Sequence, residues 1–507
     1  MSRQLFLAVD IGTQSTRVAL LDPLGKIIAS HSRGYAMVTP RAGWAEQDPE
    51  EWWDAVVEGI RAVLQTAQVQ EGEILALCCD AQMHATIPIG PAGELLSHGV
   101  QLWCDKRPSD LVDELAGHSF LPEAVRIAGS PPVAAWVGFK ILWLKRHQPE
   151  VYARTWRFLT GAGFVNYRLT GEVGIDWSEA SGFFLLDAQT LSWSETLADF
   201  LGIDMQKLPA VYPSAQVIGR VSVEAARLTG LHAGIPVLAG AGDMFSMLVA
   251  TGLVERGRAT DVCGTSAILA VYLDEPVLGK PVMNLHHAWP GWCPFGIIDS
   301  GGGALRWLRD ELAQAEVQQA AQKGISAYDI LSERAQAEEP GSEGLLFFPY
   351  LMGERVLGTP KARGVFFGLS LRSNLGAMAR AVMEGIAFEM RRTLEIVERA
   401  GHPVNEIYTT GGGARSEVWC QIKADIYQKP VYTLTVEEGG VLGSALLGMV
   451  GSGYCTDPQT ATAQCVQTAR VFLPDPALKE RYAALFDLYK DVHDRLQEPF
   501  NKLSGIQ

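Results

Sequence analysis

Short apolar runs alternate with small polar turns at the start of the chain. Residues 5–9 and 17–21 are apolar runs typical of strands, and the segment 10–16 between them has the composition of a tight turn. Residues 22–25 predict a second turn, and residues 26–30 predict a third strand. The opening of the chain therefore predicts a β-meander.

The apolar spacing then changes to a helical period. Residues 50–65 predict a helix, with Asp48 as its N-cap and Pro49 in its first turn. Residues 74–79 and 100–103 predict buried strands. Strands that alternate with helices favour an α/β fold.

A second strand–turn–strand pattern lies about half a chain further on. Residues 258–269 repeat the order of strand, Asp, Gly-Thr and strand found at 9–16. Chance is the alternative explanation, because Gly-Thr pairs are common. A duplicated domain is the interpretation we favour, with a boundary near residues 252–257 and domains spanning 1–255 and 256–507.

The length of the chain supports two domains. A single core rarely grows beyond about 300 residues, and this chain has 507. In its second half, apolar patterns predict strands over 344–349 and 407–410, and helices over 374–400, 416–427, 442–450 and 475–496.

Composition and charge exclude several classes of protein. With 48% hydrophobic and 20% charged residues, the chain is typical of globular proteins and not of disordered ones. Lys and Arg number 42 against 57 Asp and Glu, which gives a formal net charge of −15. General binders of nucleic acids or anionic membranes require the opposite sign. We therefore expect neither a nucleic-acid partner nor a membrane partner.

The cysteines and the most apolar segment point to the cytoplasm. Eight cysteines without a CxxC pair predict buried, reduced thiols, and the first residues lack the pattern of a signal peptide. Residues 233–254 are strongly apolar, but they contain Pro236, four glycines and Asp243. A membrane span does not easily hold that mixture.

Two turns rich in glycine and hydroxyl residues, one in each half, are candidate phosphate sites. Backbone N–H groups and hydroxyls in such turns bind phosphate oxygens. A neighbouring carboxylate can hold Mg²⁺ through water. An ordinary hairpin turn is the alternative for either one. The candidates are Gly12, Thr13, Gln14, Ser15 and Thr16 in the first turn, Gly264, Thr265 and Ser266 in the second, and Asp10 beside the metal.

A third glycine-rich segment lies between the predicted strand 407–410 and the helix that follows it. Glycines at this position allow the backbone to approach a nucleotide closely, and a strained connection is the alternative. The candidate residues are Gly411, Gly412, Gly413, Ala414 and Ser416.

Asp243 is the only charged residue of the apolar segment 233–254. It follows Gly242 and precedes a helical pattern, so one reading is a helix N-cap. The functional reading is a base that accepts a hydroxyl proton during phosphoryl transfer. A helix N-terminus favours the ionised carboxylate near neutral pH, which suits a base.

Polar residues after two predicted strands are candidates for binding a small molecule. Gln82, Met83 and His84 follow the strand 74–79, and ligands bind at the carboxyl ends of strands in open α/β sheets. Trp103 and Asp105 end the next predicted strand. A satisfied surface histidine and a surface ion pair are the corresponding alternatives.

Taken together, these motifs resemble the FGGY carbohydrate kinases over nearly the whole chain. Asp10–Thr13 and Cys263–Ser266 resemble the two phosphate turns of that family, and Gly242-Asp243 resembles its catalytic pair. The remaining matches are the loop 43–49, the segment 349–355, and residues 411–416 together with Ala424 and Asp425.

The resemblance implies two actin-like, ribonuclease-H-like ATPase domains around a central cleft. It implies ATP and Mg²⁺ as cofactors, a sugar as the small-molecule partner and a homodimer as a candidate assembly. Asp243 would be the catalytic residue, and Asp243 and Asp10 would be the carboxylates on the metal side. Gln82, Met83 and His84, with Trp103 and Asp105, would contact the sugar.

Within the family the chain is similar to xylulokinases, and the acceptor hydroxyl would belong to a pentulose, D-xylulose first. Ala85 and Met244 depart from the xylulokinase pattern, which has Gly and Asn there. Ribulose, erythritol or a quorum-signal sugar are the alternative substrates. A non-enzymatic, actin-like nucleotide switch is the alternative outside catalysis.

Overall fold

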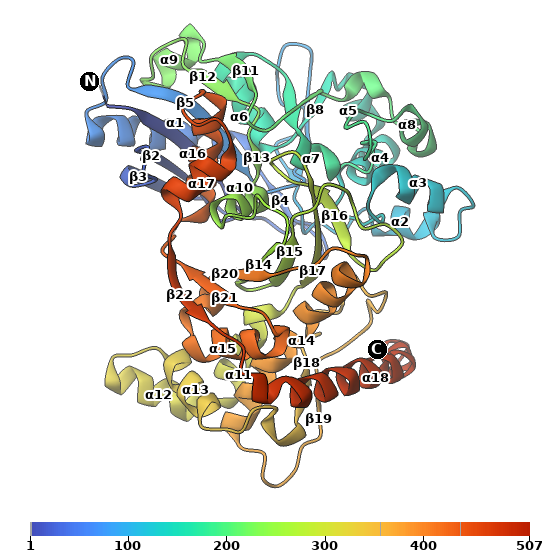
Figure 1. The fold of residues 1–507 in the computed structure, drawn as a ribbon. Coiled ribbons are helices and arrows are strands. Elements are labelled where there is room, and N and C mark those ends of the chain that lie inside the picture. The colour runs from blue at the N-terminus through green and yellow to red at the C-terminus, as the bar shows by residue number, and fades with distance from the viewer. Residues whose placement is uncertain (1–2, 355, 437, 507) are drawn as a thin grey trace.

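The computed structural model describes residues 3–354, 356–436 and 438–506, so Arg355 of the segment 349–355 lies outside it. Two mixed sheets form the centres of two α/β halves (Figure 1). The first sheet has the order β11-β12-β5-β1-β2-β3, with β13 paired to β5. Its strands are β1 (Leu5–Ile11), β2 (Ser15–Leu21), β3 (Ile27–Gly34), β5 (Ile74–Ala81), β11 (Val217–Arg220), β12 (Pro236–Leu238) and β13 (Ala241–Gly242).

The second sheet repeats the central order of the first. Its order is β16-β17-β15-β14-β20-β21-β22. The strands are β14 (Arg258–Cys263), β15 (Ala267–Val271), β16 (Met283–His286), β17 (Trp292–Ile298), β20 (Glu406–Thr410), β21 (Val431–Leu434) and β22 (Thr468–Phe472). β1 pairs antiparallel with β2 and parallel with β5, and β14 pairs in the same way with β15 and β20. This repeated topology agrees with the duplication predicted from the sequence.

Helix α1 (Pro49–Ala67) forms where the sequence predicts it. The side chain of Asp48 accepts a hydrogen bond from the amide of Glu50 at 3.0 Å, and Pro49 occupies the first turn. Trp52, Val56, Ile60 and Val63 are spaced three or four residues apart and are buried against the first sheet. The helix ends at Gln68, which has a left-handed backbone.

The remaining helices and short strands surround the two sheets. In the first half they are α2 (Ser109–Leu115), α3 (Leu121–Ala128), α4 (Val137–His147), α5 (Pro149–Arg154), α6 (Gly161–Thr170), α7 (Trp177–Ser181), α8 (Glu195–Leu201), α9 (Val223–Thr229), α10 (Asp243–Ala250), β4 (Glu46–Gln47), β6 (Ile87–Ile89), β7 (Val100–Gln101), β8 (Arg157–Leu159), β9 (Gly174–Asp176) and β10 (Ala210–Tyr212). In the second half they are α11 (Gly301–Leu312), α12 (Gln314–Lys323), α13 (Ala327–Gln336), α14 (Leu375–Arg399), α15 (Glu417–Tyr427), α16 (Gly439–Gly451), α17 (Pro458–Cys465), α18 (Lys479–Ser504), β18 (Leu346–Phe348) and β19 (Val365–Phe367).

One helix of the second half completes the core of the first. α16 packs against β1, β5 and α10, so a red helix lies among the blue and green elements in Figure 1. Val441, Ala445 and Leu446 are buried in the same cluster as Phe6 and Ala8. The chain then returns to the second sheet through β22. The division into 1–255 and 256–507 remains a prediction, and α16 crosses it.

Three expectations of detail need correction. β1 continues through Ile11, because its backbone still pairs with Thr16, so Asp10 lies in the strand and not in the turn. β7 ends at Gln101 and is shorter than the predicted strand 100–103. All eight cysteines are free, but Cys104 and Cys465 are only partly buried.

Within the described ranges, none of the helices combines the length and the apolar character that crossing a membrane requires.

Candidate active site

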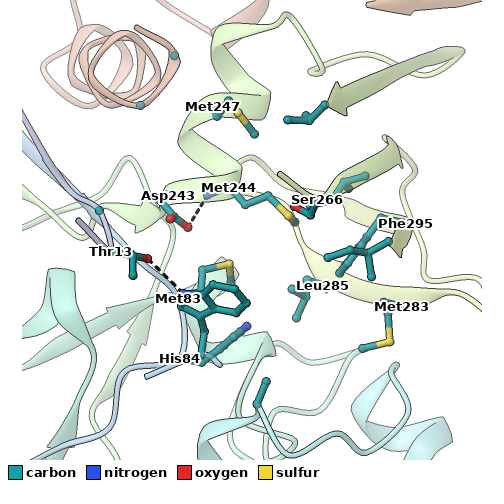
Figure 2. Close-up of a pocket in the computed structure, with 18 of the residues that line it drawn as sticks. Thr13, Met83, His84, Asp243, Met244, Met247, Ser266, Met283, Leu285 and Phe295 are labelled. Atoms are coloured by element: carbon teal, nitrogen blue, oxygen red, sulfur yellow. Dashed lines mark hydrogen bonds between the residues drawn. The ribbon is translucent and has the colours of Figure 1, made fainter. Parts of the chain in front are cut away.

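A cavity of about 590 Å³ lies between the two halves (Figure 2). Side chains from both sheets line it, and most of them are apolar. The polar lining comes chiefly from Asp10, Thr13, His84, Asp243, Ser266 and Glu438. The cavity therefore brings together residues of the first phosphate turn, the second phosphate turn, the candidate base and the candidate sugar-binding segment.

Asp10 reaches the cavity from the end of β1. It is the register partner of Asp80 on β5, and Asp80 accepts a hydrogen bond from the Ser444 hydroxyl of α16 at 2.6 Å. A Cβ atom on Gly440 would come within 2.3 Å of an Asp10 carboxylate oxygen, so glycine lets α16 begin this close without displacing the Asp10 side chain. Burial is the main cause that raises the pKa of Asp10.

Asp243 opens helix α10, directly after the N-cap residue Gly242. Its carboxylate accepts a hydrogen bond from the amide of Met244 at 2.7 Å, and its side chain points into the cavity in Figure 2. Burial, followed by the charge of Asp10, raises the pKa of Asp243 to about 7. The sequence predicts that the helix N-terminus favours the ionised carboxylate near neutral pH, but desolvation opposes this effect, so a pKa of about 7 leaves the group only partly ionised there. Asp243 is also not the N-cap.

Within the first phosphate turn, Gly12 and Thr13 line the cavity. The Gly12 amide donates to the Ser15 carbonyl at 3.0 Å, which closes the turn, and the Thr13 hydroxyl accepts from the Trp103 indole at 3.2 Å. The Thr16 hydroxyl lies 3.2 Å from that of Tyr35. Gln14, Ser15 and Thr16 are not among the described lining residues.

In the second phosphate turn, Ser266 is the residue that lines the cavity. The Gly264 amide donates to the Ser266 carbonyl at 2.9 Å, and the Thr265 carbonyl accepts from the amide of Gly303 at 3.0 Å. Gly264 and Thr265 are therefore held against the start of α11. Neither of them is among the described lining residues.

The third glycine segment packs against the second turn. Gly411 has a φ of 83°, and a Cβ on it would come within 2.7 Å of the Cys263 carbonyl oxygen. A Cβ on Gly413 would lie 2.9 Å from the Cys263 side chain, whereas one on Gly412 would meet its first atom at 3.9 Å. Ser416 caps α15. Of the described residues at 411–416, none lines the cavity, Ala414 included.

The candidate sugar contacts divide into two groups. Met83, His84 and Trp103 line the cavity, whereas Gln82 and Asp105 are absent from its described lining. The side-chain amide of Gln82 donates to the side-chain oxygen of Gln47 at 2.7 Å. The Asp105 carboxylate accepts from the Ala45 amide at 2.8 Å and pairs with the Arg107 guanidinium, as a buried structural carboxylate does.

Sequence reasoning missed several lining residues. Gly439 and Gly440 precede a helical pattern, and two adjacent glycines at that position are the signal that could have found them. The apolar wall of the second half carries no comparable signal, since its residues look like ordinary strand core. The missed residues are Val133, Ala135, Trp136, Met244, Met247, Val262, Ile268, Met283, Leu285, Phe295, Ile297, Glu438, Gly439 and Gly440.

The chemistry that this arrangement supports is proton transfer beside an anion site. A partly buried carboxylate with a pKa near neutrality, such as Asp243, can accept a proton from a hydroxyl. Gly12 and Gly440 also line the cavity, and backbone amides at such turns and helix starts bind groups with negative charge.

The chain matches the FGGY family over both halves. Residues 5–250 match the N-terminal domain of the FGGY family of carbohydrate kinases, and residues 259–452 match its C-terminal domain. It is 28% identical over 499 residues to the xylulose kinase of Bacillus subtilis (strain 168), with 97% of each chain covered. It is 30% identical over 511 residues to the gluconokinase of the same organism, with 99% of this chain and 98% of the relative covered.

The fold agrees with this match. The crystal structure of gluconate kinase from Lactobacillus acidophilus superposes with a TM-score of 0.92 at 28% identity, over 99% of this chain and 100% of the other. The two actin-like halves predicted from the sequence are thereby confirmed, as is the resemblance of its motifs. The chain belongs to the FGGY family of carbohydrate kinases.

Proposed function

We propose that this kinase transfers the γ-phosphoryl group of ATP to a terminal hydroxyl of a pentulose, with D-xylulose as the first acceptor. The observation that carries the proposal is Asp243, a partly buried carboxylate that faces a cavity lined by both phosphate turns. The similarity to a xylulose kinase and the lining residues Met83 and His84 support the choice of sugar. Membership in a family of kinases leaves no reason to retain the nucleotide switch.

The residues present fit ATP and Mg²⁺. Mg²⁺ keeps several waters and needs only one or two carboxylates beside the substrate phosphates, and Asp10 and Asp243 both line the cavity. Gly12 and Gly440 offer backbone that a side chain would otherwise cover. Asp10 would hold the metal through water, and the metal would neutralise phosphate charge when bound.

Asp243 acts on the sugar hydroxyl in this proposal. Phosphoryl transfer has a loose transition state, so the main task of the base is to orient the attacking oxygen and to take its proton late. The Met244 amide and the Met83 backbone bond the carboxylate and fix its direction. Met83 is thus adjacent to the base in space, which supports a sugar contact beside the reacting hydroxyl.

The pH dependence of catalysis follows from the raised pKa of Asp243. The base must be ionised, and its pKa is about 7. We expect kcat/KM for the sugar to fall about tenfold per pH unit below pH 7 and to level off above it. Steady-state rates between pH 5.5 and pH 9, compared with Asp243→Asn, measure this. A flat profile from pH 5.5 upward would contradict Asp243 as the titrating base.

His84 is expected to govern the sugar and not the nucleotide. Its ring lines the cavity, and an imidazole can bond a hydroxyl through either nitrogen. His84→Ala should raise the KM for D-xylulose by about tenfold and flatten the preference among pentuloses, with the KM for ATP unchanged. His232→Ala changes an exposed histidine of the same half and serves as control. An unchanged sugar profile would remove His84 from the site.

A sugar panel tests the proposed function. ATP turnover is measured with D-xylulose, D-ribulose, erythritol and gluconate, each against a sample without sugar. We expect turnover to require a sugar and kcat/KM to be highest for D-xylulose. If kcat/KM is highest for gluconate, to which the name of the gluconokinase relative points, the assigned substrate would change and the assignment as a kinase would stand. Equal ATP turnover without any sugar would contradict the proposal.

A further inference from the structure

His84 has an unusual backbone conformation for a residue in a binding site. Its φ is 66°, a left-handed value that residues other than glycine rarely adopt. Gly182 lies against the ring, because a Cβ there would come within 2.4 Å of it. The Trp136 indole meets the ring edge-on with centroids 4.9 Å apart. The surroundings therefore fix both the backbone and the ring of His84.

Two buried ionisable side chains hold the peptide groups of His84. Its amide donates to the Glu179 carboxylate at 3.2 Å, and its carbonyl accepts from the Lys140 ammonium at 2.7 Å. Glu179 belongs to α7 and Lys140 to α4. Strained backbone at a binding site persists only where the surrounding structure fixes it, and these two contacts supply that restraint.

Lys140 also holds the second segment that reaches the cavity. Its ammonium donates to the Leu102 carbonyl at 2.7 Å, and the next residue is Trp103, whose indole bonds Thr13. The Lys140 side chain is fully buried. One side chain thus bonds the backbone of His84 and the backbone of Leu102, the residue before Trp103.

The position of Lys140 is costly for the fold. Burial lowers the pKa of Lys140 to about 7, and the other residues buried along α4 carry no charge, among them Phe139, Ile141 and Leu142. The charged and titratable groups that act on it are Asp105, Cys104, Glu179 and Arg107. An apolar residue would fill the same space without desolvation, so packing alone does not account for a lysine.

We propose that Lys140 is a positioning residue for sugar specificity, which sets His84 and Trp103 at a fixed separation by bonding the backbone carbonyls of His84 and Leu102. This inference rests on the proposed function of the cavity as the sugar site. Lys140 acts through these backbone segments and does not itself line the cavity. Its loss should therefore affect the sugar and spare the nucleotide.

The test is the variant Lys140→Met, which keeps the length of the side chain and removes the donors. We expect the KM for the preferred sugar to rise about tenfold or more and the KM for ATP to change less than twofold. Lys145→Met is the matched control, because Lys145 lies on the same helix and donates to the Gly202 carbonyl away from the cavity. A structural role alone would change both KM values, or the melting temperature only.

A double-mutant cycle separates action through His84 from a general effect. If Lys140 acts through His84, Lys140→Met should raise the sugar KM less in the His84→Ala background than in the wild type. Lys140→Gln retains two N–H donors on a shorter side chain and should give an intermediate KM. Equal effects in both backgrounds, or a wild-type sugar KM in Lys140→Gln and Lys140→Met, would overturn the proposal.

Two further outcomes are informative. If both Lys140 variants fail to fold while Lys145→Met is soluble, Lys140 is a folding residue and the positioning role is wrong. If the wild type phosphorylates no sugar of the panel, the proposed function and this inference fail together. Wild-type activity with an unchanged sugar KM in the variants removes only the inference.

Discussion

Asp243→Asn should lower kcat by ~10²-fold or more and should raise the melting temperature at pH 8. The amide has the same size and still accepts the Met244 amide at the start of α10, so the local structure survives. It cannot take a proton from the attacking hydroxyl. The loss of rate therefore comes from the lost base.

The gain in stability follows from the direction of the pKa shift. The folded pKa of Asp243 is about 7, above its ordinary value of 3.8. Between these values the folded state binds more protons than the unfolded state, so stability falls as the pH rises towards 7 and stays reduced above it. The ionised, partly buried carboxylate costs on the order of a few kcal/mol at pH 8, and asparagine removes that cost.

Measuring kcat beside thermal melting curves at pH 5 and pH 8 checks both effects. The difference in melting temperature between variant and wild type should be larger at pH 8 than at pH 5. A stabilised variant with wild-type kcat would contradict the assignment of Asp243 as base. A variant that melts lower at both pH values would assign a structural role to the carboxylate.

Asp10→Asn should abolish most activity at physiological Mg²⁺ without loss of the fold. The backbone of β1 pairs with β2 and β5 regardless of this side chain, whereas a metal shell needs the negative charge. We expect the Mg²⁺ concentration for half-maximal rate to rise about tenfold or more. Titrating Mg²⁺ at saturating ATP and sugar measures it.

Asp261→Asn is the matched control for this experiment. Asp261 lies on β14, the counterpart of β1, but its carboxylate is buried with Lys423 at 2.8 Å. Its loss should leave Lys423 unpaired and lower the melting temperature, with the Mg²⁺ requirement unchanged. If Asp10→Asn works at the wild-type rate in low Mg²⁺, the metal role of Asp10 is wrong.

The contrast between Asp10 and Asp261 explains one limit of the sequence analysis. Both aspartates precede a Gly-Thr turn, and the two motifs look alike. Asp10 lies two residues before Gly12, whereas Asp261 lies three residues before Gly264. Because side chains alternate along a strand, one added residue turns the carboxylate to the other face. The sequence pattern predicts the duplication, but the sheet face on which each carboxylate lies depends on this single residue.

Other elements were predictable to differing degrees. Helix α1 carries its own cap, proline and apolar spacing, so local sequence determines its existence and its ends. Asp105 and Gln82 could not be placed, because the tertiary fold brings Ala45 to Asp105 and Gln47 to Gln82. The apolar wall of the cavity was not predicted either, because hydrophobic strand residues have the sequence pattern of core residues whether or not a second sheet faces them.

The crossing of α16 has a consequence for synthesis on the ribosome. The first sheet is translated by about residue 255, but α16, which covers β1 and β5, ends only at Gly451. At the usual ~5–20 residues per second, roughly 10–40 seconds pass between the two. During that interval the face that holds Phe6 and Ala8 lacks its cover by α16. The nascent first half should therefore be a client of chaperones until the second half is almost finished.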